Sequence, residues 1–294
     1  METIISSATK EVIIGDERPT VLIGERINPA GKKKMAEALK QENLDIVRQE
    51  AIDQVEAGAD VIDVSVGTFG VDEASLLPQA IQLVMETVDV PLCIDSANPE
   101  ALEEAIKVYR GKPLINSVSG EERSLARVLP LAKRHEAAVI GLLQDDDGIP
   151  GNVERRVEIA RKIVKRAESI GIPREDIIID CLAFAVGASP GSALVTIEAV
   201  RRVKAELEVN LTLAASNVSF GLPDRNVLNN AFVASAIVAG VTCMIVDVAR
   251  VRPSVLAADL VLDRDKHARR YIEAYRQRTD RDIMGRSVQV QPHP

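Results

Sequence analysis

Short runs of apolar and β-branched residues recur along the chain, and longer segments with helical spacing separate them. The core of one run, Leu92–Ile94, is apolar without alternation, which is typical of a strand buried on both faces. Eight such runs occur, at residues 21–28, 61–67, 91–96, 113–120, 137–145, 176–184, 211–220 and 243–248. The intervening segments predict helices near residues 43–57, 73–88, 98–110, 121–135, 152–170, 191–207, 225–239 and 252–278.

Eight strand–helix units without a linker between halves favour a closed (β/α)8 TIM barrel, an α/β fold. An open sheet of eight parallel strands is the alternative. The segment after the first run, GERINPAGKKK, has neither the dinucleotide glycine pattern nor the spacing of a phosphate-binding loop. We expect the barrel to span residues 21–280, with a C-terminal tail at 281–294. Residues 1–20 contain the short run EVIIG, and we expect them to cover the barrel bottom or to form a small hairpin.

Polar side chains stand at the end of every predicted strand. In chain order they are Glu25 and Asn28, Asp63, Asp95, Asn116, Gln144 and Asp145, Asp180, Ser216 and Asn217, and Asp247. A single Asp in this position is explained by capping of the next helix. In a barrel, however, all the carboxyl ends of the strands meet at one rim, where active sites of this fold lie. Burying each unpaired group costs about 1–3 kcal/mol, so a ligand or a mutual network must satisfy them.

Composition narrows the classes of ligand. The net charge of −8 argues against a nucleic acid as the main partner. With three His and no Trp, the chain has little for a His-rich metal site or for stacking of bases. The three Cys each lie in an apolar run, as expected for small buried side chains. No apolar run reaches 18 residues and no cleavable leader is visible, so we expect a cytoplasmic protein.

The chemistry of the predicted rim points to a ligand with several N–H donors. The rim is rich in acceptors such as Asp63, Asp95 and Asp180, and it has few cations. Sugar phosphates would require Lys, Arg or a glycine-lined helix N-terminus. A flat heterocycle suits carboxylates, because one carboxylate accepts two parallel N–H bonds, and a 2-amino-4-oxo-pyrimidine edge presents such a pair. A divalent cation is the competing use of these groups, but no strand end carries a D-x-D pair, so we predict no metal site.

The strand-end motifs together resemble one known family. They are GERIN, IDVSVG, CIDS, INS, IGL followed by GIP, IID and SNVSFGLPDR, in order from about residue 21 to 265. This pattern resembles the methyltetrahydrofolate:corrinoid methyltransferases of the pterin-binding barrel superfamily, which also holds dihydropteroate synthase. The resemblance implies an enzyme that moves a methyl group between N5 of tetrahydrofolate and the cobalt of a corrinoid. Two positions depart from the family pattern, Ser65 where Asn is frequent and Ala214 where Gly is frequent.

The resemblance also implies roles for individual residues. Asp95, Asn116 and Asp180 would hold the pterin ring by its donor edge, with Asp63 on the floor of the site. Asn217 would lie near N5, and together with Asp95 it would stabilise a protonated N5 in the transition state. The further residues assigned to folate binding are Glu25, Asn28, Ser216 and Arg225. Tetrahydrofolate or 5-methyltetrahydrofolate would be the substrate.

The resemblance further implies a homodimer and a partner protein that carries the corrinoid. Cobalt-binding modules have a D-x-H-x-x-G motif, and the segment Asp265–Arg270 lacks its Gly. We therefore interpret His267 as an exposed helix residue and expect a separate corrinoid protein to dock on the open rim. The apolar segments 231–240 and 253–262 offer surface for the dimer.

Several alternatives stay open at the level of sequence. The acidic run Asp145–Asp147 would repel anions, bind a cation, contact the partner or form a solvated turn closed by Gly148 and Pro150. The lysines at 32–34 would attract the folate tail or begin a helix. Dihydropteroate synthase is an alternative function, although it requires a Ser-x-Arg motif where this chain has DVAR at 247–250. A non-catalytic folate-binding protein is another. The direction of methyl transfer and the upstream donor are not set by the sequence.

Overall fold

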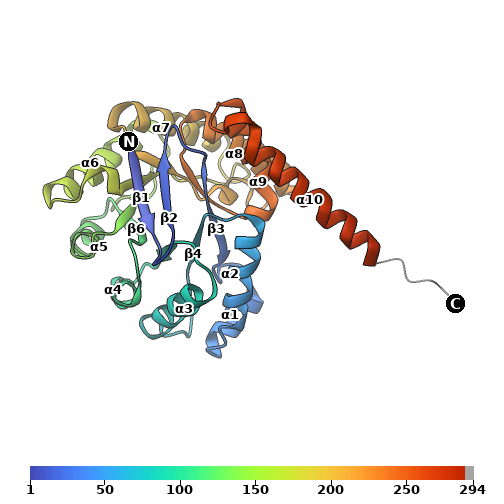
Figure 1. Cartoon of the computed structure of the whole chain (residues 1–294). Coiled ribbons are helices and arrows are strands. Elements are labelled where there is room, and N and C mark those ends of the chain that lie inside the picture. The colour runs from blue at the N-terminus through green and yellow to red at the C-terminus, as the bar shows by residue number, and fades with distance from the viewer. Residues whose placement is uncertain (289–294) are drawn as a thin grey trace.

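The computed structural model describes the backbone of residues 1–288 and the side chains of residues 1–279. Eight parallel strands form one sheet in the order β10-β3-β4-β5-β6-β7-β8-β9. The first and last strands of this order are joined by hydrogen bonds from Thr242 N to Leu211 O and from Ile245 N to Leu213 O, both 3.0 Å long. The expected (β/α)8 barrel is therefore confirmed (Figure 1).

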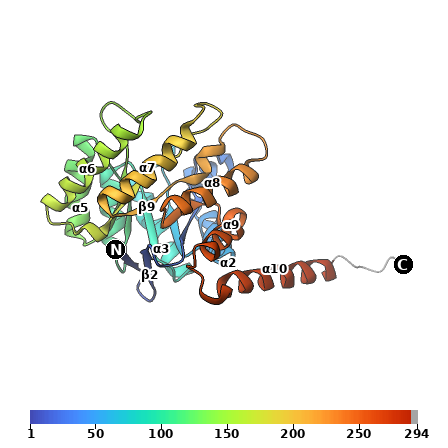
Figure 2. The same ribbon diagram turned by 90° about the horizontal axis from the view of Figure 1, so that it is seen from above.

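The strands and helices alternate as the sequence predicts. The barrel strands are β3 (Val21–Ile27), β4 (Val61–Val64), β5 (Leu92–Asp95), β6 (Leu114–Ser119), β7 (Ala138–Leu142), β8 (Ile177–Asp180), β9 (Asn210–Thr212) and β10 (Cys243–Val246). The helices that follow them are α2 (Asp45–Ala57), α3 (Glu73–Thr87), α4 (Pro99–Val108), α5 (Glu122–Arg134), α6 (Val153–Ser169), α7 (Ser192–Leu207), α8 (Arg225–Ala239) and α9 (Val248–Val261). The short helix α1 (Lys33–Lys40) precedes α2, and a 3-10 turn, η1 (Arg174–Asp176), precedes β8. Figure 2 shows the helices around the strands.

The side chains of each strand alternate between two cores. Inward residues such as Ile23, Cys93 and Ile178 form a core inside the barrel, whereas Leu22 and Ile94 pack against the helices. This alternation follows from the two-residue period of a strand. It sets the direction of every polar residue at a strand end.

The first residues of the chain close the bottom of the barrel. Strands β1 (Glu2–Ser6) and β2 (Glu11–Gly15) form an antiparallel hairpin. The hairpin residues Ile5, Val12 and Ile14 belong to the same core as the inward residues of the barrel strands. The hairpin thus excludes water from the end of the barrel opposite the rim.

Several elements differ from the sequence prediction, among them the helix α1, which is not among the predicted helix ranges. The predicted helix at 252–278 is wrong: α9 ends at Val261 and α10 (Arg269–Val288) is a separate helix. His267 lies between them in the 3-10 turn η3 (Lys266–Ala268) with φ of +61°, so its interpretation as a helix residue is also wrong. The predicted strand at 211–220 is shorter, because η2 (Ala215–Ser219) follows β9 as a 3-10 helix.

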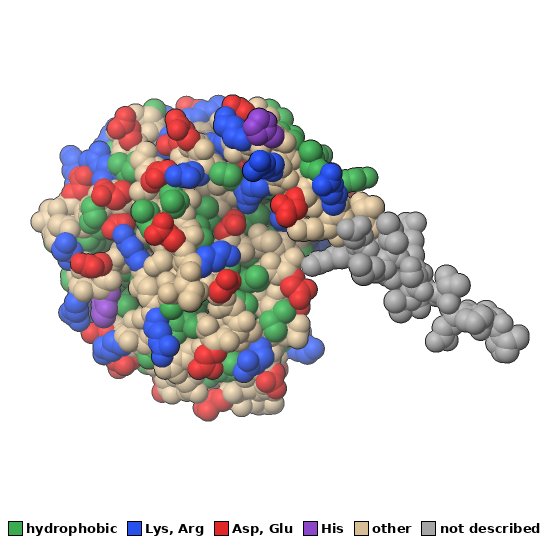
Figure 3. Space-filling model, in the orientation of Figure 1, with side chains coloured by type: hydrophobic (Ala, Val, Ile, Leu, Met, Phe, Trp, Pro, Cys, Tyr) green, Lys and Arg blue, Asp and Glu red, His purple; other side chains and the backbone are tan. Residues whose placement is uncertain are grey.

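Helix α10 extends from the body of the barrel (Figure 2). It is continuous across the boundary expected between residues 280 and 281. Residues 289–294 of the expected tail lie outside the described residues. Within the described part of the chain, no helix is long and apolar enough to cross a membrane. Acidic and basic side chains are interspersed on the face seen in Figure 3.

A buried arginine fixes the backbone that follows β8. Arg156 of α6 is 1% exposed. Its guanidinium donates to the carbonyl oxygens of Pro150, Cys181 and Leu182 at 2.6–3.0 Å, and to the Thr196 hydroxyl at 3.1 Å. Burial lowers the pKa of Arg156. These bonds satisfy carbonyl groups that the end of β8 leaves without a strand partner.

We predict that Arg156→Met lowers the free energy of unfolding by about 3 kcal/mol, because buried carbonyl groups lose their donor. The measurement is urea denaturation followed by circular dichroism. Arg166→Met is the matched control, since Arg166 lies on the same helix, is 40% exposed at its side chain and pairs with Glu122 at 2.8 Å. It should change the free energy of unfolding by less than about 1 kcal/mol. Equal losses for both variants would contradict the prediction.

Candidate functional site

The polar residues at the strand ends point into the mouth of the barrel. On β4, β5, β6 and β8, the inward core residues Val61, Cys93, Leu114 and Ile178 are each followed two positions later by Asp63, Asp95, Asn116 and Asp180. Because side chains two positions apart share a face, these four polar groups also face inward. Asp95 pairs in register with Asn116 on the adjacent strand.

Asp63 and Asp95 form the centre of the acceptor-rich half of the mouth. Asn116 Nδ2 donates to Asp63 Oδ1 at 3.1 Å, and the Cys93 thiol, one layer deeper, also donates to Asp63. Asp95 accepts a hydrogen bond from Ser65. Burial raises the pKa of Asp63, and burial together with the nearby Asp63 charge raises the pKa of Asp95 well above its usual value. The two carboxylates therefore resist being charged at the same time.

Asp180 holds the backbone that follows two adjacent strands, β8 and β9. Its Oδ1 accepts from Leu182 N at 2.7 Å, and it also accepts from Ala214 N, which follows β9. Burial raises the pKa of Asp180 to about 6, although both backbone hydrogen bonds lower it. Ala214, the departure from the family pattern, thus contributes its N–H to the site rather than its side chain.

The opposite half of the mouth holds Glu25 and the segment with Asn217. Ser216 Oγ donates to Glu25 Oε1 at 2.8 Å. Arg225 Nη2 donates to Ser216 O at 2.8 Å, and its Nε donates to Ser219 Oγ at 2.9 Å. The Asn217 side chain is exposed and makes no hydrogen bond within the described part of the protein. The segment is therefore held from several sides while the amide of Asn217 stays available.

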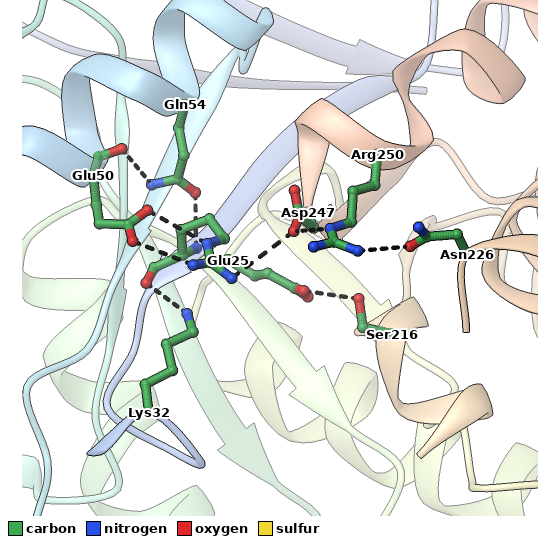
Figure 4. Close-up of polar contacts among 9 residues, drawn as sticks. Glu25, Lys32, Glu50, Gln54, Ser216, Asn226, Asp247 and Arg250 are labelled. Carbon is green, nitrogen blue, oxygen red and sulfur yellow. Dashed lines mark hydrogen bonds and ion pairs between the residues drawn. The ribbon is translucent and has the colours of Figure 1, made fainter. Parts of the chain in front are cut away.

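A network of ion pairs surrounds this half of the mouth (Figure 4). Arg26 lies 3.3 Å from Glu50 and 3.9 Å from Asp247, and Asp247 also pairs with Arg250 at 3.1 Å. Arg250 then donates to Asn226 Oδ1 at 3.1 Å. The sequence analysis predicted few cations at the rim, but the structure places Arg26 and Arg250 there. They are compensated by carboxylates from α2 and the end of β10.

Sequence reasoning missed most of this network. Gln54 Oε1 accepts from Arg26 N at 2.8 Å, and Lys32 Nζ donates to Arg26 O at 2.7 Å. Lys32 thereby fixes the loop before α1 rather than standing free in solvent. The signal in the sequence was the polar pair Glu50 and Gln54 on the otherwise apolar face of a helix, but its partner on another element is not readable from the chain.

Other predicted residues lie at the edge of the site. Asn28 Oδ1 accepts from Ala30 N at 2.9 Å, which shapes the loop after β3. Asp145 is buried and pairs with Arg155 at 2.6 Å, in a turn where Gly148 has φ of +92°. Within the described residues, no group of His, Cys, Asp and Glu side chains is arranged to hold a metal ion.

An open cleft of about 480 Å³ adjoins the acceptor-rich half. Asp95 and Asn116 line it, together with Ser96, Gln144 and two arginines of α5, Arg123 and Arg127. Asp63, Asp180 and Asn217 are not among its lining residues. The structure therefore brings Asp95 and Asn116 into one cleft and links Asp63 to Asn116 by a hydrogen bond.

The chain is similar to several known proteins. The chain is 32% identical over 267 residues to the methylcorrinoid:tetrahydrofolate methyltransferase of Eubacterium limosum, covering 87% of this chain and 96% of that protein. It is 30% identical over 284 residues to methionine synthase of Mycobacterium tuberculosis, of which it spans 24%. Among solved structures, dihydropteroate synthases of Yersinia pestis and Thermus thermophilus are similar in fold, with TM-scores of 0.69 and 0.63 at 17% and 20% identity. They cover 90% and 88% of this chain, which in turn spans 100% and 99% of theirs.

The pterin binding enzyme family matches residues 24–247. This range begins within β3 and ends at Asp247, directly after β10, so it contains the other seven strands of the barrel, the end of β3 and all of the inward polar groups at its mouth. The chain belongs to the pterin binding enzyme family.

Proposed function

We propose that this protein is a methyltransferase that moves a methyl group between N5 of tetrahydrofolate and a corrinoid carried by a separate protein. The observation that carries the proposal is the set of inward carboxylate and amide groups on β4, β5, β6 and β8. The 32% identity to a methylcorrinoid:tetrahydrofolate methyltransferase over nearly the full length of both chains supports the reaction type.

The acceptor-rich half of the mouth suits the pterin ring. Asp95, Asn116 and Asp180 hold its donor edge, and Asp63 supports Asn116 from below at 3.1 Å. A carboxylate accepts two parallel N–H bonds, as the 2-amino-4-oxo-pyrimidine edge requires. The cleft of about 480 Å³ beside Asp95 has a volume typical of small-ligand sites. Asn28 and Arg225 complete the walls above the ring.

The amide of Asn217 forms a hydrogen bond to N5 of the folate, the nitrogen that carries the methyl group. Methyl transfer from a tertiary amine is slow unless N5 gains positive character, because an amine anion is a poor leaving group. The exposed Asn217 amide has no competing protein partner in the described residues, and its backbone is held by neighbours on both sides. A preorganised hydrogen bond of this kind stabilises charge that develops in the transition state.

The corrinoid comes from a partner that docks on the rim. Within the described residues, the two histidines are His135, at the end of α5, and His267, in η3 beyond the end of α9. Both lie at the opposite end of the barrel from the strand ends, so neither serves as a cobalt ligand at the mouth. The corrinoid supplies the methyl acceptor or donor when the partner is bound.

Dihydropteroate synthase chemistry is the alternative. It requires cations that bind a pyrophosphate. Arg26 and Arg250 at this rim both pair with Asp247, whereas Arg123 and Arg127 in the cleft beside Asp95 make no ion pair among the described residues. The similarity to solved dihydropteroate synthases supports the shared fold alone. The cytoplasmic location expected from the sequence stays a prediction, as does the division into residues 1–20, 21–280 and 281–294.

We predict that the purified protein, mixed with 5-methyltetrahydrofolate and reduced free cobalamin, forms methylcobalamin in a change visible in the cobalt spectrum. An active methyltransferase of known activity is the positive control. A flat spectrum beside an active control would contradict the proposed function. Consumption of a dihydropterin pyrophosphate with an aromatic amine would establish the alternative instead.

Two variants should distinguish a residue that binds folate from a residue that acts in the chemical step. Asp95→Ala should weaken folate binding by roughly 10- to 150-fold, because a charged hydrogen-bond acceptor contributes about 1.5–3 kcal/mol. Asn217→Ala should lower the single-turnover rate with saturating folate by about 100-fold and change affinity by less than about threefold. Calorimetry and rapid-mixing spectroscopy are the two measurements.

The control for these variants is Asp89→Ala, since Asp89 is 67% exposed at its side chain and follows α3 at the bottom of the barrel. It should change neither affinity nor rate. Equal losses of affinity and rate for Asn217→Ala would make it an ordinary binding residue, and an unchanged rate would remove it from the mechanism.

We propose that the protein is a homodimer formed by surfaces away from the rim. Val238 of α8 and Val261 of α9 are 59% and 82% exposed, and Tyr275 of α10 is 57% exposed. Light scattering should give twice the chain mass of 31.8 kDa. Val261→Asp should shift the protein toward monomer, because a charge in an apolar interface is costly. A monomer at all working concentrations would reject the proposal.

A further inference from the structure

Ser216 lies across the barrel mouth from Asp95, and its hydrogen-bond partner Glu25 lies two strands from Asp95 and three strands from Asn116. In the strand order β10-β3-β4-β5-β6-β7-β8-β9, β6 is four strands from β10, and β5 is four strands from β9. In a closed barrel of eight strands, four strands apart means diametrically opposite. Asp95 ends β5 and Asn116 lies on β6, whereas Ser216 follows β9 and Glu25 lies on β3 beside β10. Asp180 ends β8 beside β9 and so lies nearer to Ser216 than Asp95 does.

The reacting nitrogen of a bound pterin faces this second side. The 2-amino and N3–H donors belong to one ring of the pterin, and N5 belongs to the other ring. When the donor edge meets Asp95 and Asn116, the ring with N5 therefore extends toward Ser216 and Asn217.

The contact between Ser216 and Glu25 is short and well supported. Ser216 Oγ donates to Glu25 Oε1 at 2.8 Å, and the two side chains point toward one another from η2 and β3 (Figure 4). Arg225 Nη2 donates to the Ser216 carbonyl oxygen at 2.8 Å. This bond holds the Ser216 backbone in place and so keeps its hydroxyl beside Glu25. Both residues are partly buried, with Glu25 on the barrel side of the hydroxyl. The Ser216 hydroxyl therefore lies between the Glu25 carboxyl group and the open mouth of the barrel.

We propose that Ser216 and Glu25 form the route by which a proton reaches and leaves N5. The proposal rests on the proposed methyl transfer and names the proton donor that this reaction needs. When the C–N bond breaks, its electron pair stays on N5 and the methyl group passes to the electron pair of the reduced corrinoid. The Ser216 hydroxyl proton moves to N5, the Glu25 carboxyl proton moves to Ser216 Oγ, and Glu25 is left as a carboxylate. In the reverse direction the N5 proton returns to Glu25 by the same two transfers.

The surroundings of Glu25 raise its pKa above the ordinary value of a glutamate and so favour the protonated form. Burial is the largest cause that raises the pKa of Glu25, and the carboxylate of Asp247 raises it further. The Ser216 hydrogen bond, Lys32 and Arg26 lower it. Asp63 on the neighbouring strand also faces Glu25, because the Glu25 charge raises the pKa of Asp63. Asp63 itself is bonded to Asn116 and Cys93, so it has no hydroxyl that leads to the N5 side.

The pH dependence of the wild-type rate tests the route in both directions. Free cobalamin is the probe, so no docking partner is needed. The single-turnover rate from 5-methyltetrahydrofolate to reduced cobalamin should rise as pH falls through the pKa of Glu25, because the protonated form is required. The rate from methylcobalamin to tetrahydrofolate should fall across the same inflection, because the carboxylate must accept the proton. Inflections at unrelated pH values in the two directions would overturn the proposal.

Two variants separate this route from protonation of the folate by solvent. Glu25→Gln keeps an acceptor for Ser216 but cannot exchange a proton, and Ser216→Ala keeps Glu25 but removes the connecting hydroxyl. Each should lower the single-turnover rate by about 100-fold or more and remove the inflection, with folate affinity changed by less than about threefold. Retention of the inflection in either folded variant would overturn the proposal.

Glu50→Gln is the matched control, because it removes a carboxylate from the same network but contacts Arg26 rather than Ser216. It should keep the inflection and the rate within about threefold. A merely structural role of Glu25 would lower affinity and rate together and leave the pH profile unchanged in shape. A wild-type protein without methyl transfer in either direction would instead refute the proposed function, which is a distinct outcome.

Discussion

The burial of several carboxylates at one end of the barrel is the constraint on which the site depends. Asp63 and Asp180 are 2% and 3% exposed, and neither they nor Asp95 make an ion pair among the described residues. Burying a charge without a partner is costly, so the protein must supply hydrogen bonds or keep protons on these groups. It does both. Neutral donors, namely the Asn116 amide, the Cys93 thiol and backbone N–H groups, bind Asp63 and Asp180, and burial raises the pKa of all three carboxyl groups.

This choice of neutral donors divides the mouth into two halves with different chemistry. Around Asp63 and Asp95, compensation by an arginine would occupy the acceptors that a ligand with N–H groups requires. On the side of β3 and β10, by contrast, arginines pair with Glu50 and Asp247 and tie α2, β3 and α9 together. The ion-pair network therefore gives rigidity where the ring edge does not bind. The acceptor-rich half stays open to a neutral heterocycle.

The sequence was sufficient for the barrel and for the inward polar groups, because both follow from periodic patterns. Apolar strands such as Ile177–Ile179 and the helix stop at Gly171 and Pro173 have local causes. The break between α9 and α10 was missed, since Asp263, His267 and Ala268 adopt positive φ without Gly or Pro to signal it. Its one readable signal was Asp265, whose carboxylate caps α10 by accepting from two backbone N–H groups at 3.1 and 2.9 Å.

The contacts that position the site were not predictable for a different reason. Glu25 and Ser216 are 191 residues apart, and Arg156 binds carbonyl oxygens that follow another strand. The contact between Glu25 and Ser216 depends on the closure of the barrel, which places β9 beside β10 and β10 beside β3. Asp180 in turn ties Leu182 after its own strand to Ala214 after the adjacent strand β9. Because Asp180, Glu25 and Arg225 each hold a different atom of the segment 214–219, the barrel itself orients Asn217, and its amide needs no bond of its own to stay in place.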